Sequence, residues 1–241
     1  MLLASIQLFA LVSVAPVEIG QKPGLHGDVS IALDTKKGNT DKENYAGATK
    51  VVYDSNASYV AWAQLSGEYG ESNNIEDTNK LYFHARYIEA ITPTTLRWEG
   101  FLQLQEDKFK RINSRRVLGG GLRYGLFDFF DKATLYGGAG GMIEYIEYTS
   151  ADPFERNLRF NTYLSLVVPF NKTSTFAYSF YYQPKLDDLL DYVESHSAEL
   201  ELKMIENLYL SVEITYDIDT NPAIGVKEDD FTQKTKFTYK F

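Results

Sequence analysis

The sequence predicts an all-β fold, a transmembrane antiparallel up-and-down β-barrel of about 12 strands, and three observations carry this prediction. Apolar and polar residues alternate with period two from Leu25 onward, which is the pattern of strands with two unlike faces. Most alternating segments reach the ~9–11 residues that a tilted membrane strand needs, whereas soluble strands usually have ~5–6. Tight turns and longer polar loops join the segments in alternation, as in barrels of the bacterial outer membrane.

The expected strands follow one another along the chain without a segment of helical period. In the clearest of them, apolar residues from Leu208 to Tyr216 alternate with mostly polar ones. The expected strands are 25–35, 43–54, 57–70, 78–90, 94–106, 114–126, 132–148, 156–169, 174–184, 191–203, 206–217 and 230–241. Four prolines fall at or beyond strand ends, where a missing N–H does little harm: Pro93, Pro153, Pro184 and Pro222.

The connections predict which end of the barrel is which. Short turns are expected at 54–56, 90–93, 171–172 and 204–205, and a somewhat longer one at 127–131. Longer polar loops are expected at 36–42, 71–77, 107–113, 149–155, 185–190 and 218–229. Short periplasmic turns and long external loops are typical of the bacterial outer membrane, and an even strand number places both ends of the barrel in the periplasm.

Composition excludes several other classes of protein. The chain has 241 residues and a formal net charge of −9, and it has no cysteine. A disulfide framework, a thiolate nucleophile and a cysteine metal site are therefore absent. The excess of acidic residues argues against a nucleic-acid partner, because phosphate binding needs lysine and arginine. After residue 16 no apolar stretch approaches the ~18 residues of a membrane-spanning helix.

The first 16 residues predict export. They read MLLASIQLFALVSVAP, carry no charge and end in small residues, as the apolar part of a signal peptide does. Ser13 and Ala15 suit the positions before a cleavage site, although no lysine or arginine precedes the run. We therefore assign residues 1–16 to a partial signal peptide and residues 17–241 to the barrel domain.

Aromatic residues are expected to form two girdles on the lipid-facing side, because amphipathic rings favour membrane interfaces. One girdle is expected near the periplasmic rim: Tyr53, Tyr59, Phe170, Phe176, Tyr239 and Phe241. The other is expected near the external rim: Tyr45, Tyr69, Phe160, Tyr182 and Tyr216. The closing alternation of Phe237, Tyr239 and Phe241 also resembles the C-terminal signal by which the barrel-assembly machinery recognises its substrates.

In each alternating strand the polar residues are expected to face the lumen, and many of them are charged. The expected basic groups are Arg86, Arg97, Arg115, Arg123, Arg159, Lys236 and Lys240. The expected acidic groups are Asp28, Glu99, Glu144, Glu199, Glu201 and Glu213. In a narrow lumen these charges would form ion pairs, for example Arg123 with Glu144, and act as a plug. In a wide lumen, arginines facing a glutamate cluster would set up a transverse field that orients polar solutes. Parity leaves both alternatives open. Glu194 is the misfit, since it falls on the lipid-facing parity. Either it lies at the external rim, or a bulge shifts the register there.

Metal and nucleotide sites have weaker support. Asp217, Asp219, Asn221 and Glu228 match the spacing of a calcium-binding loop, but Pro222 stands where that loop needs glycine and no helices flank it. The glycine runs 119–121 and 137–141 lie inside strands and lack a lysine, so they indicate tight curvature or close backbone approach rather than a phosphate cradle. We expect no cofactor.

Catalysis is also not expected. Some outer-membrane lipid hydrolases use a histidine and a serine two positions apart on one strand face. Two positions after His26, His84 and His196 stand Asp28, Arg86 and Ala198. Ser195 and Ser197 flank His196 but belong to the opposite face, although a triad across strands stays open.

Several short motifs together resemble a known family. They are Gly38-Asn39-Thr40-Asp41, the run from Arg116 to Tyr124 around Gly119-Gly120-Gly121, Gly138-Ala139-Gly140-Gly141 with Glu144, Arg159, Gln183-Pro184, Gly225-Val226-Lys227 and Tyr239-Lys240-Phe241. In this order, over residues ~25–241, they resemble the domain of unknown function 481 family, described as salt-induced outer-membrane proteins. The resemblance implies an outer-membrane barrel and implies no activity.

The sequence thus predicts an integral outer-membrane β-barrel, either a small or gated channel or a structural barrel of the envelope stress response. The alternative is an outer-membrane lipid hydrolase or deacylase. The expected partners are outer-membrane lipids, the barrel-assembly machinery and small polar solutes.

Overall fold

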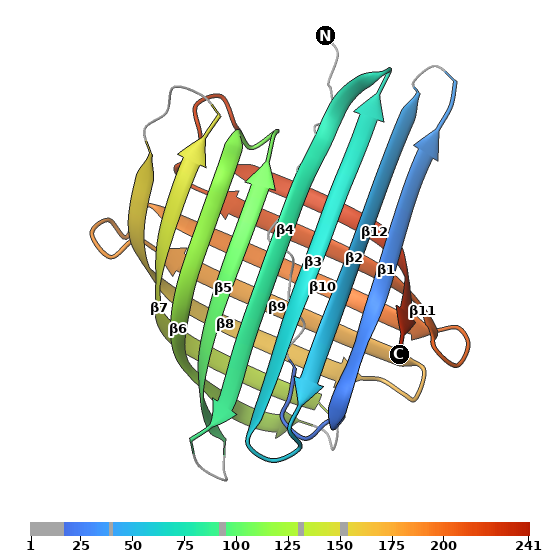
Figure 1. Cartoon of the computed structure of the whole chain (residues 1–241), viewed down its shortest axis with the longest axis vertical. Helices are drawn as coiled ribbons and strands as arrows, with labels where there is room; N and C mark the ends of the chain where they lie inside the picture. The colour runs from blue at the N-terminus through green and yellow to red at the C-terminus, as the bar shows by residue number, and fades with distance from the viewer. Residues whose placement is uncertain (1–16, 39–40, 92–94, 130–132, 150–153) are drawn as a thin grey trace.

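The computed structural model describes residues 17–38, 41–91, 95–129, 133–149 and 154–241. These residues form a closed antiparallel barrel in which each strand pairs with its neighbours in sequence and β1 pairs with β12 (Figure 1). The strands are β1 (Gly24–Lys36), β2 (Lys42–Asp54), β3 (Tyr59–Ser72), β4 (Ile75–Ala90), β5 (Leu96–Asp107), β6 (Ile112–Phe129), β7 (Ala133–Tyr148), β8 (Glu155–Pro169), β9 (Ser174–Pro184), β10 (Tyr192–Lys203), β11 (Leu208–Asp219) and β12 (Asp229–Lys240).

The predicted fold class and strand number are confirmed, and two predicted loops are shorter than expected. The expected loop at 71–77 is a two-residue turn, because Asn73 and Asn74 adopt positive φ angles of 52° and 61° and let β3 and β4 continue to it. The expected loop at 107–113 is likewise reduced to 108–111. The expected signal peptide at 1–16, together with Pro93 and Pro153, lies outside the described residues.

The barrel has an apolar outside and a polar inside, the reverse of a soluble protein. On β8, Leu158, Phe160 and Leu164 are 54%, 45% and 44% exposed, while the alternate residues Arg159 and Asn161 are each 3% exposed. Such an outward surface suits contact with lipid chains. Among the described residues, no helix is long and apolar enough to cross a membrane.

The two rims differ in what they carry. We call the end at which β1 begins and β12 ends the terminal rim, and the opposite end the loop rim. Outward aromatic rings lie at the terminal rim, where Tyr53 contacts Tyr59 and Phe170 contacts Phe176, with 6.0 and 6.3 Å between ring centroids. The longest connection described at the loop rim, residues 220–228, joins β11 to β12.

Glycine allows β6 and β7 to approach closely, as the sequence predicts. A Cβ atom on Gly121 would lie 2.4 Å from the carbonyl oxygen of Ala139, and one on Gly140 would lie 2.1 Å from that of Gly120. Gly138 leaves room inside the lumen in the same way, because the ring of Tyr163 lies where its Cβ would be. These glycines therefore lie within paired strands of the barrel wall and not in a phosphate-binding turn.

Candidate lumen site

One half of the lumen, along β3 to β8, is filled by aromatic and arginine side chains. The Arg86 guanidinium lies over the rings of Trp62, Phe101 and Tyr163, at 5.9, 5.2 and 5.7 Å from their centroids. It also lies 3.5 Å from the carboxylate of Glu99. Desolvated cation–π contacts of this kind are worth about 2 kcal/mol. This half of the interior therefore leaves little room for solutes.

Arg123 and Arg97 approach the same ring in this filled half, that of Tyr136. The Arg123 guanidinium lies 3.8 Å from the centroid of that ring, and that of Arg97 lies 5.9 Å from it. The expected pair of Arg123 with Glu144 is wrong, because Arg123 lies opposite Gly138 while Glu144 lies opposite Val117. Six residues along a strand separate the two positions, which is about 20 Å.

Glu144 instead joins two other arginines in a buried network near the loop rim. Arg115 donates from Nε to Glu144 Oε1 at 2.6 Å, and Arg159 donates from Nε to Glu144 Oε2 at 2.9 Å. Arg159 also donates from Nη2 to Asp191 at 2.9 Å, and Asp191 lies 2.5 Å from Lys185. The network ties β6, β7 and β8 to the connection before β10.

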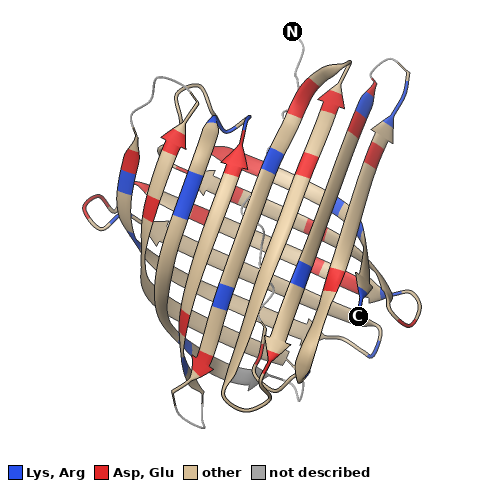
Figure 2. Ribbon diagram, in the orientation of Figure 1, with Lys and Arg blue, Asp and Glu red and all other residues tan. Residues whose placement is uncertain are grey.

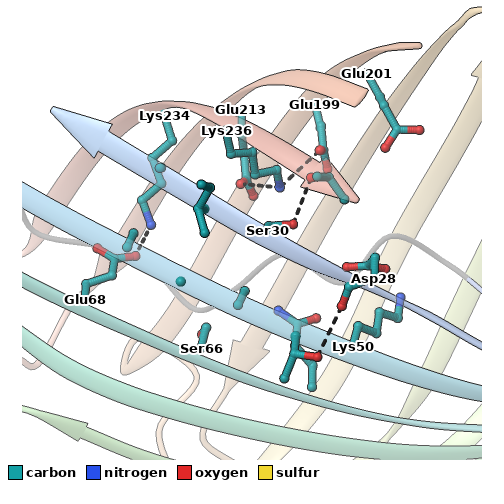
Figure 3. A pocket seen from close by; sticks show the side chains of 18 of the residues that line it. Asp28, Ser30, Lys50, Ser66, Glu68, Glu199, Glu201, Glu213, Lys234 and Lys236 are labelled. Carbon is teal, nitrogen blue, oxygen red and sulfur yellow. Dashed lines mark hydrogen bonds and ion pairs between the residues drawn. The ribbon is translucent and has the colours of Figure 1, made fainter. Parts of the chain in front are cut away.

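The other half of the lumen contains a chamber of about 250 Å³ between β1–β3 and β10–β12 (Figure 3). Small inward residues on β1–β3 create its space: Ser30, Ala32, Ala46, Ala48 and Ser66. Its acidic lining groups are Asp28, Glu68, Glu199, Glu201 and Glu213, and its basic ones are Lys50, Lys234, Lys236 and Lys240. The sequence analysis did not name Glu68, Lys50 and Lys234. The same period-two alternation places all three on the inward face of their strands.

Acidic and basic groups of the chamber alternate instead of facing each other across the lumen. Lys236 lies 3.1 Å from Glu199 and 3.0 Å from Glu213, and Lys240 lies 2.6 Å from Glu201. Figure 2 shows that basic and acidic positions are spread over the strands of the barrel, without one side being only basic or only acidic. A field across the lumen needs separated charges, so this arrangement does not favour the transverse field considered from the sequence.

The chamber is more open at one end than at the other. Lys240 and Glu201, toward the terminal rim, have 37% and 22% of their side chains exposed. Toward the loop rim, Lys234 reaches across from β12 to the carboxylate of Glu68 (Figure 3). Glu68 also lies 4.0 Å from Lys80. The side chains of Glu68 and Lys80 are each 5% exposed. This cross-lumen contact therefore narrows the chamber toward the loop rim.

Residues 220–228 cover the loop rim side of the lumen. Asn221 donates to Asp191 at 3.0 Å, and Ala223 is buried. Below this connection, Lys110 lies 2.7 Å from Asp230. Burial lowers the pKa of Lys110, but the carboxylates of Asp217 and Asp230 outweigh it and hold that pKa above its ordinary value.

The side chains matched to a calcium loop are used otherwise. Asp219 accepts from the backbone N–H of Asn221 at 3.1 Å, Asn221 binds Asp191, and Glu228 contributes its carbonyl oxygen to Asp219 at 2.7 Å. Asp217 lies inside the lumen and is buried. Within the described ranges, no group of three or more His, Asp or Glu side chains is placed to hold a metal ion.

A short segment before β1 closes part of the terminal rim. Asp54, 2% exposed, accepts from the backbone N–H groups of Gly20 at 2.9 Å and Lys22 at 3.2 Å. Val17 accepts from Arg123 Nη1 at 3.1 Å. Val17 and Ile19 also pack on an apolar cluster inside the barrel: Val52, Val60, Trp62 and Ile88. Polar and apolar contacts thus hold residues 17–22 in place together.

The three histidines occupy unlike places. His84 is buried in the lumen, where it stacks on Trp62 with 4.6 Å between ring centroids. His26 lies at the terminal rim in β1. His196 faces outward, and Ser195 and Ser197 beside it are buried on the lumen side. No histidine–serine pair of the hydrolase type forms at His196.

Solved structures share this architecture at low sequence identity. The COG4313 outer membrane channel from Pseudomonas putida F1 matches with a TM-score of 0.60 and 12% identity, over 95% of this chain and 100% of that one. The translocator domain of the autotransporter NalP from Neisseria meningitidis matches with a TM-score of 0.54 and 10% identity, over 92% and 89%. At 12% and 10% identity, these likenesses show the fold alone.

The comparison with curated proteins gives no match. The family comparison does, with a model described as "Protein of unknown function, DUF481" that covers residues 29–241. The match takes in every strand except the first residues of β1, so it describes the barrel as a whole. The chain belongs to the DUF481 family.

Proposed function

We propose that this chain is a small gated channel of the bacterial outer membrane, described here in its closed form, and that it admits small polar solutes. The observation that carries the proposal is the charged chamber in the lumen. Inward residues of β12 line it from Thr232 to Lys240, which is about 27 Å of strand. A chamber that follows a strand for most of its length suits a passage better than a local packing defect.

The size of the chamber limits what it admits. At about 250 Å³ it has room for roughly eight waters, since each occupies ~30 Å³ in the liquid. A solute of a few heavy atoms that exchanges hydrogen bonds with the Lys and Glu side chains fits this space. An apolar solute would leave these charged groups unsolvated, which is unfavourable.

The contact of Lys234 with Glu68 is the proposed gate. It crosses the lumen between β12 and β3, and Lys80 on β4 adds a second cation beside Glu68. Replacing Lys234 by alanine removes the crossing side chain, while Glu68 keeps Lys80 as its partner. We therefore expect Lys234→Ala to increase single-channel conductance in planar bilayers at least severalfold over wild type.

Lys240→Ala is the matched control, because Lys240 lies on the same strand and face but at the open end of the chamber. Its conductance is expected to stay near that of wild type. If neither wild type nor Lys234→Ala conducts, the channel proposal fails and the filled half of the lumen favours a structural barrel. No contact among the described residues favours the hydrolase alternative, since Ser195 and Ser197 face away from His196.

The membrane environment belongs to the same proposal. The outward apolar surface and the aromatic rings at the rims suit an outer-membrane location with lipids as the solvent. Phe237, Tyr239 and Phe241 all point outward at the end of β12, 46%, 52% and 53% exposed, where assembly factors can reach them. Their role as a signal to the barrel-assembly machinery stays a prediction.

A further inference from the structure

A chain of hydrogen bonds lies on the outward face of β9 and β10, away from the lumen. Tyr178 Oη is 2.8 Å from His196 Nδ1, and His196 Nε2 is 2.7 Å from Glu194 Oε1. The side chains of His196 and Glu194 are 34% and 24% exposed. Glu194 therefore keeps the outward parity that made it a misfit in the sequence. No bulge moves it inward, since β10 pairs in regular register with both neighbours.

Ionisable groups on the lipid-facing side of a barrel are unfavourable, and they often mark functional sites. Two other outward carboxylates have a cation beside them: Glu147 lies 3.8 Å from Arg116, and Glu43 lies 2.5 Å from Lys37. Glu89, outward on β4, instead accepts from the hydroxyl of Tyr87 at 3.2 Å. Within the described part of the chain, no lysine or arginine lies within 4.0 Å of Glu194. Its charge is thus shared only with an imidazole, which leaves a place for a cation from outside the chain.

Aromatic rings surround this carboxylate and locate it at a membrane interface. His196 lies between Phe180 and Tyr216 on the neighbouring strands, with ring centroids 4.9 and 6.4 Å away. Tyr182 and Tyr192, toward the loop rim, contact each other at 5.3 Å. Outward tyrosines of this kind sit at the level of lipid head groups. Head groups are therefore the molecules that meet Glu194.

The hydrogen bonds decide which head group fits. A neutral imidazole that donates from Nε2 to Glu194 accepts from Tyr178 at Nδ1. Glu194 Oε2 and the lone pairs of Tyr178 Oη then stay available, and both are acceptors. The site thus needs a donor, and the aromatic faces favour a positively charged one through cation–π attraction. The phosphodiester group of a lipid carries no donor, and its negative charge would be repelled by Glu194.

We propose that Glu194, His196 and Tyr178 form a binding site on the membrane-facing wall for the primary ammonium head group of a lipid. The ammonium donates to Glu194 Oε2 and to Tyr178 Oη, and the rings of Phe180 and Tyr216 flank it. His196 is the positioning residue, because it holds both acceptors at a fixed separation. The site is separate from the chamber, which lies on the other face of β10.

Native mass spectrometry of the purified, detergent-solubilised barrel tests the site. The protein is mixed with equal amounts of dioleoyl phosphatidylethanolamine and dioleoyl phosphatidylglycerol, which share acyl chains and phosphate. We expect the phosphatidylethanolamine adduct of wild type to exceed the other about tenfold, as one charge-assisted hydrogen bond would give. Glu194→Gln is expected to bring the two adducts to near equality, and His196→Ala to reduce the preference.

Glu147→Gln is the matched control, because Glu147 is also outward and near the loop rim but is paired with Arg116. It should keep the preference of wild type, and heat-dependent migration on a gel verifies that each variant is folded. Equal adducts in folded wild type, or a preference that survives in folded Glu194→Gln, would overturn the proposal. A dimer that Glu194→Gln abolishes would assign the carboxylate to a second copy of the chain and would overturn it as well.

Discussion

At the scale of single residues, the strongest prediction concerns Glu144, which neutralises two buried arginines at once. The side chains of Glu144, Arg115 and Arg159 are 1%, 7% and 3% exposed. Removing one partner of a buried ion pair leaves an uncompensated charge and costs about 3–5 kcal/mol. We therefore expect Glu144→Gln to lower the temperature at which the folded band is lost on a gel by well over 5 °C.

Glu147→Gln is the comparison for this measurement, since it changes the same residue type on the outward face of β7. Glu147 and Arg116 are 3.8 Å apart, with side chains 46% and 62% exposed, and exposed pairs contribute about 0–1 kcal/mol. The transition of this variant should stay within a few degrees of wild type. Equal shifts for the two variants would mean that the network around Glu144 does not stabilise the barrel.

At the scale of elements, Asp54 supplies two of the hydrogen bonds that hold the segment of residues 17–22. Asp54 binds the N–H groups of Gly20 and Lys22, and hydrogen bonds to a charged group contribute about 1.5–3 kcal/mol each. Asp54→Ala is therefore expected to release the segment and to uncover the indole of Trp62, which is 4% exposed. Acrylamide quenching of Trp62 should increase clearly.

The chain has only two tryptophans, so Trp98→Phe leaves Trp62 as the sole reporter. Asp34→Ala in the same background is the control, because Asp34 pairs with Lys42 at the loop rim, far from the segment. Unchanged quenching in Asp54→Ala would show that the packing of Val17 and Ile19 is sufficient to hold the segment.

The strands were predictable because each one must alternate wherever it separates lipid from a polar lumen. This constraint ends at the membrane surface, where β3 and β4 continue as paired strands in polar sequence. The residues around Asn73 therefore look like a loop in the sequence, although two positive φ angles make them a tight hairpin. Period-two reasoning cannot distinguish a polar hairpin arm from a polar loop.

The site was predictable as a set of inward residues and not as a set of contacts. The alternation of polar and apolar residues correctly predicted that Glu144 faces the lumen, where its side chain is 1% exposed. The partner of an inward residue depends on register and on the tilt of the strands around the barrel, which the alternation of one strand does not contain. Only the structure of the closed barrel shows that Glu144 pairs with Arg115 and Arg159. It also shows that Lys234 reaches Glu68.

At the scale of the whole molecule, the barrel has one seam that differs from its other strand pairs. All of β1, Gly24–Lys36, pairs with β2, but only Asp28–Ile31 pairs with β12. Two further hydrogen bonds close the terminal rim, where Gly27 and Phe241 exchange backbone bonds of 3.1 and 2.9 Å. The loop rim half of β1 is therefore held to the barrel from one side only. This half borders the chamber, which Ser30 and Ala32 line.

The direction of single amide groups makes this asymmetry measurable. Because Gly27 bonds to Phe241, the odd-numbered residues of β1 direct their N–H groups toward β12 and the even-numbered ones toward β2. We expect the amides of Leu33 and Thr35 to exchange with deuterium at least tenfold faster than those of Val29 and Ile31, while Ala32 and Asp34 stay protected by β2. Residue-resolved exchange in lipid nanodiscs measures this. Slow exchange at Leu33 and Thr35 would mean that the seam is paired along its full length in the membrane, whereas fast exchange there would identify the β1–β12 seam as the place where this barrel opens first.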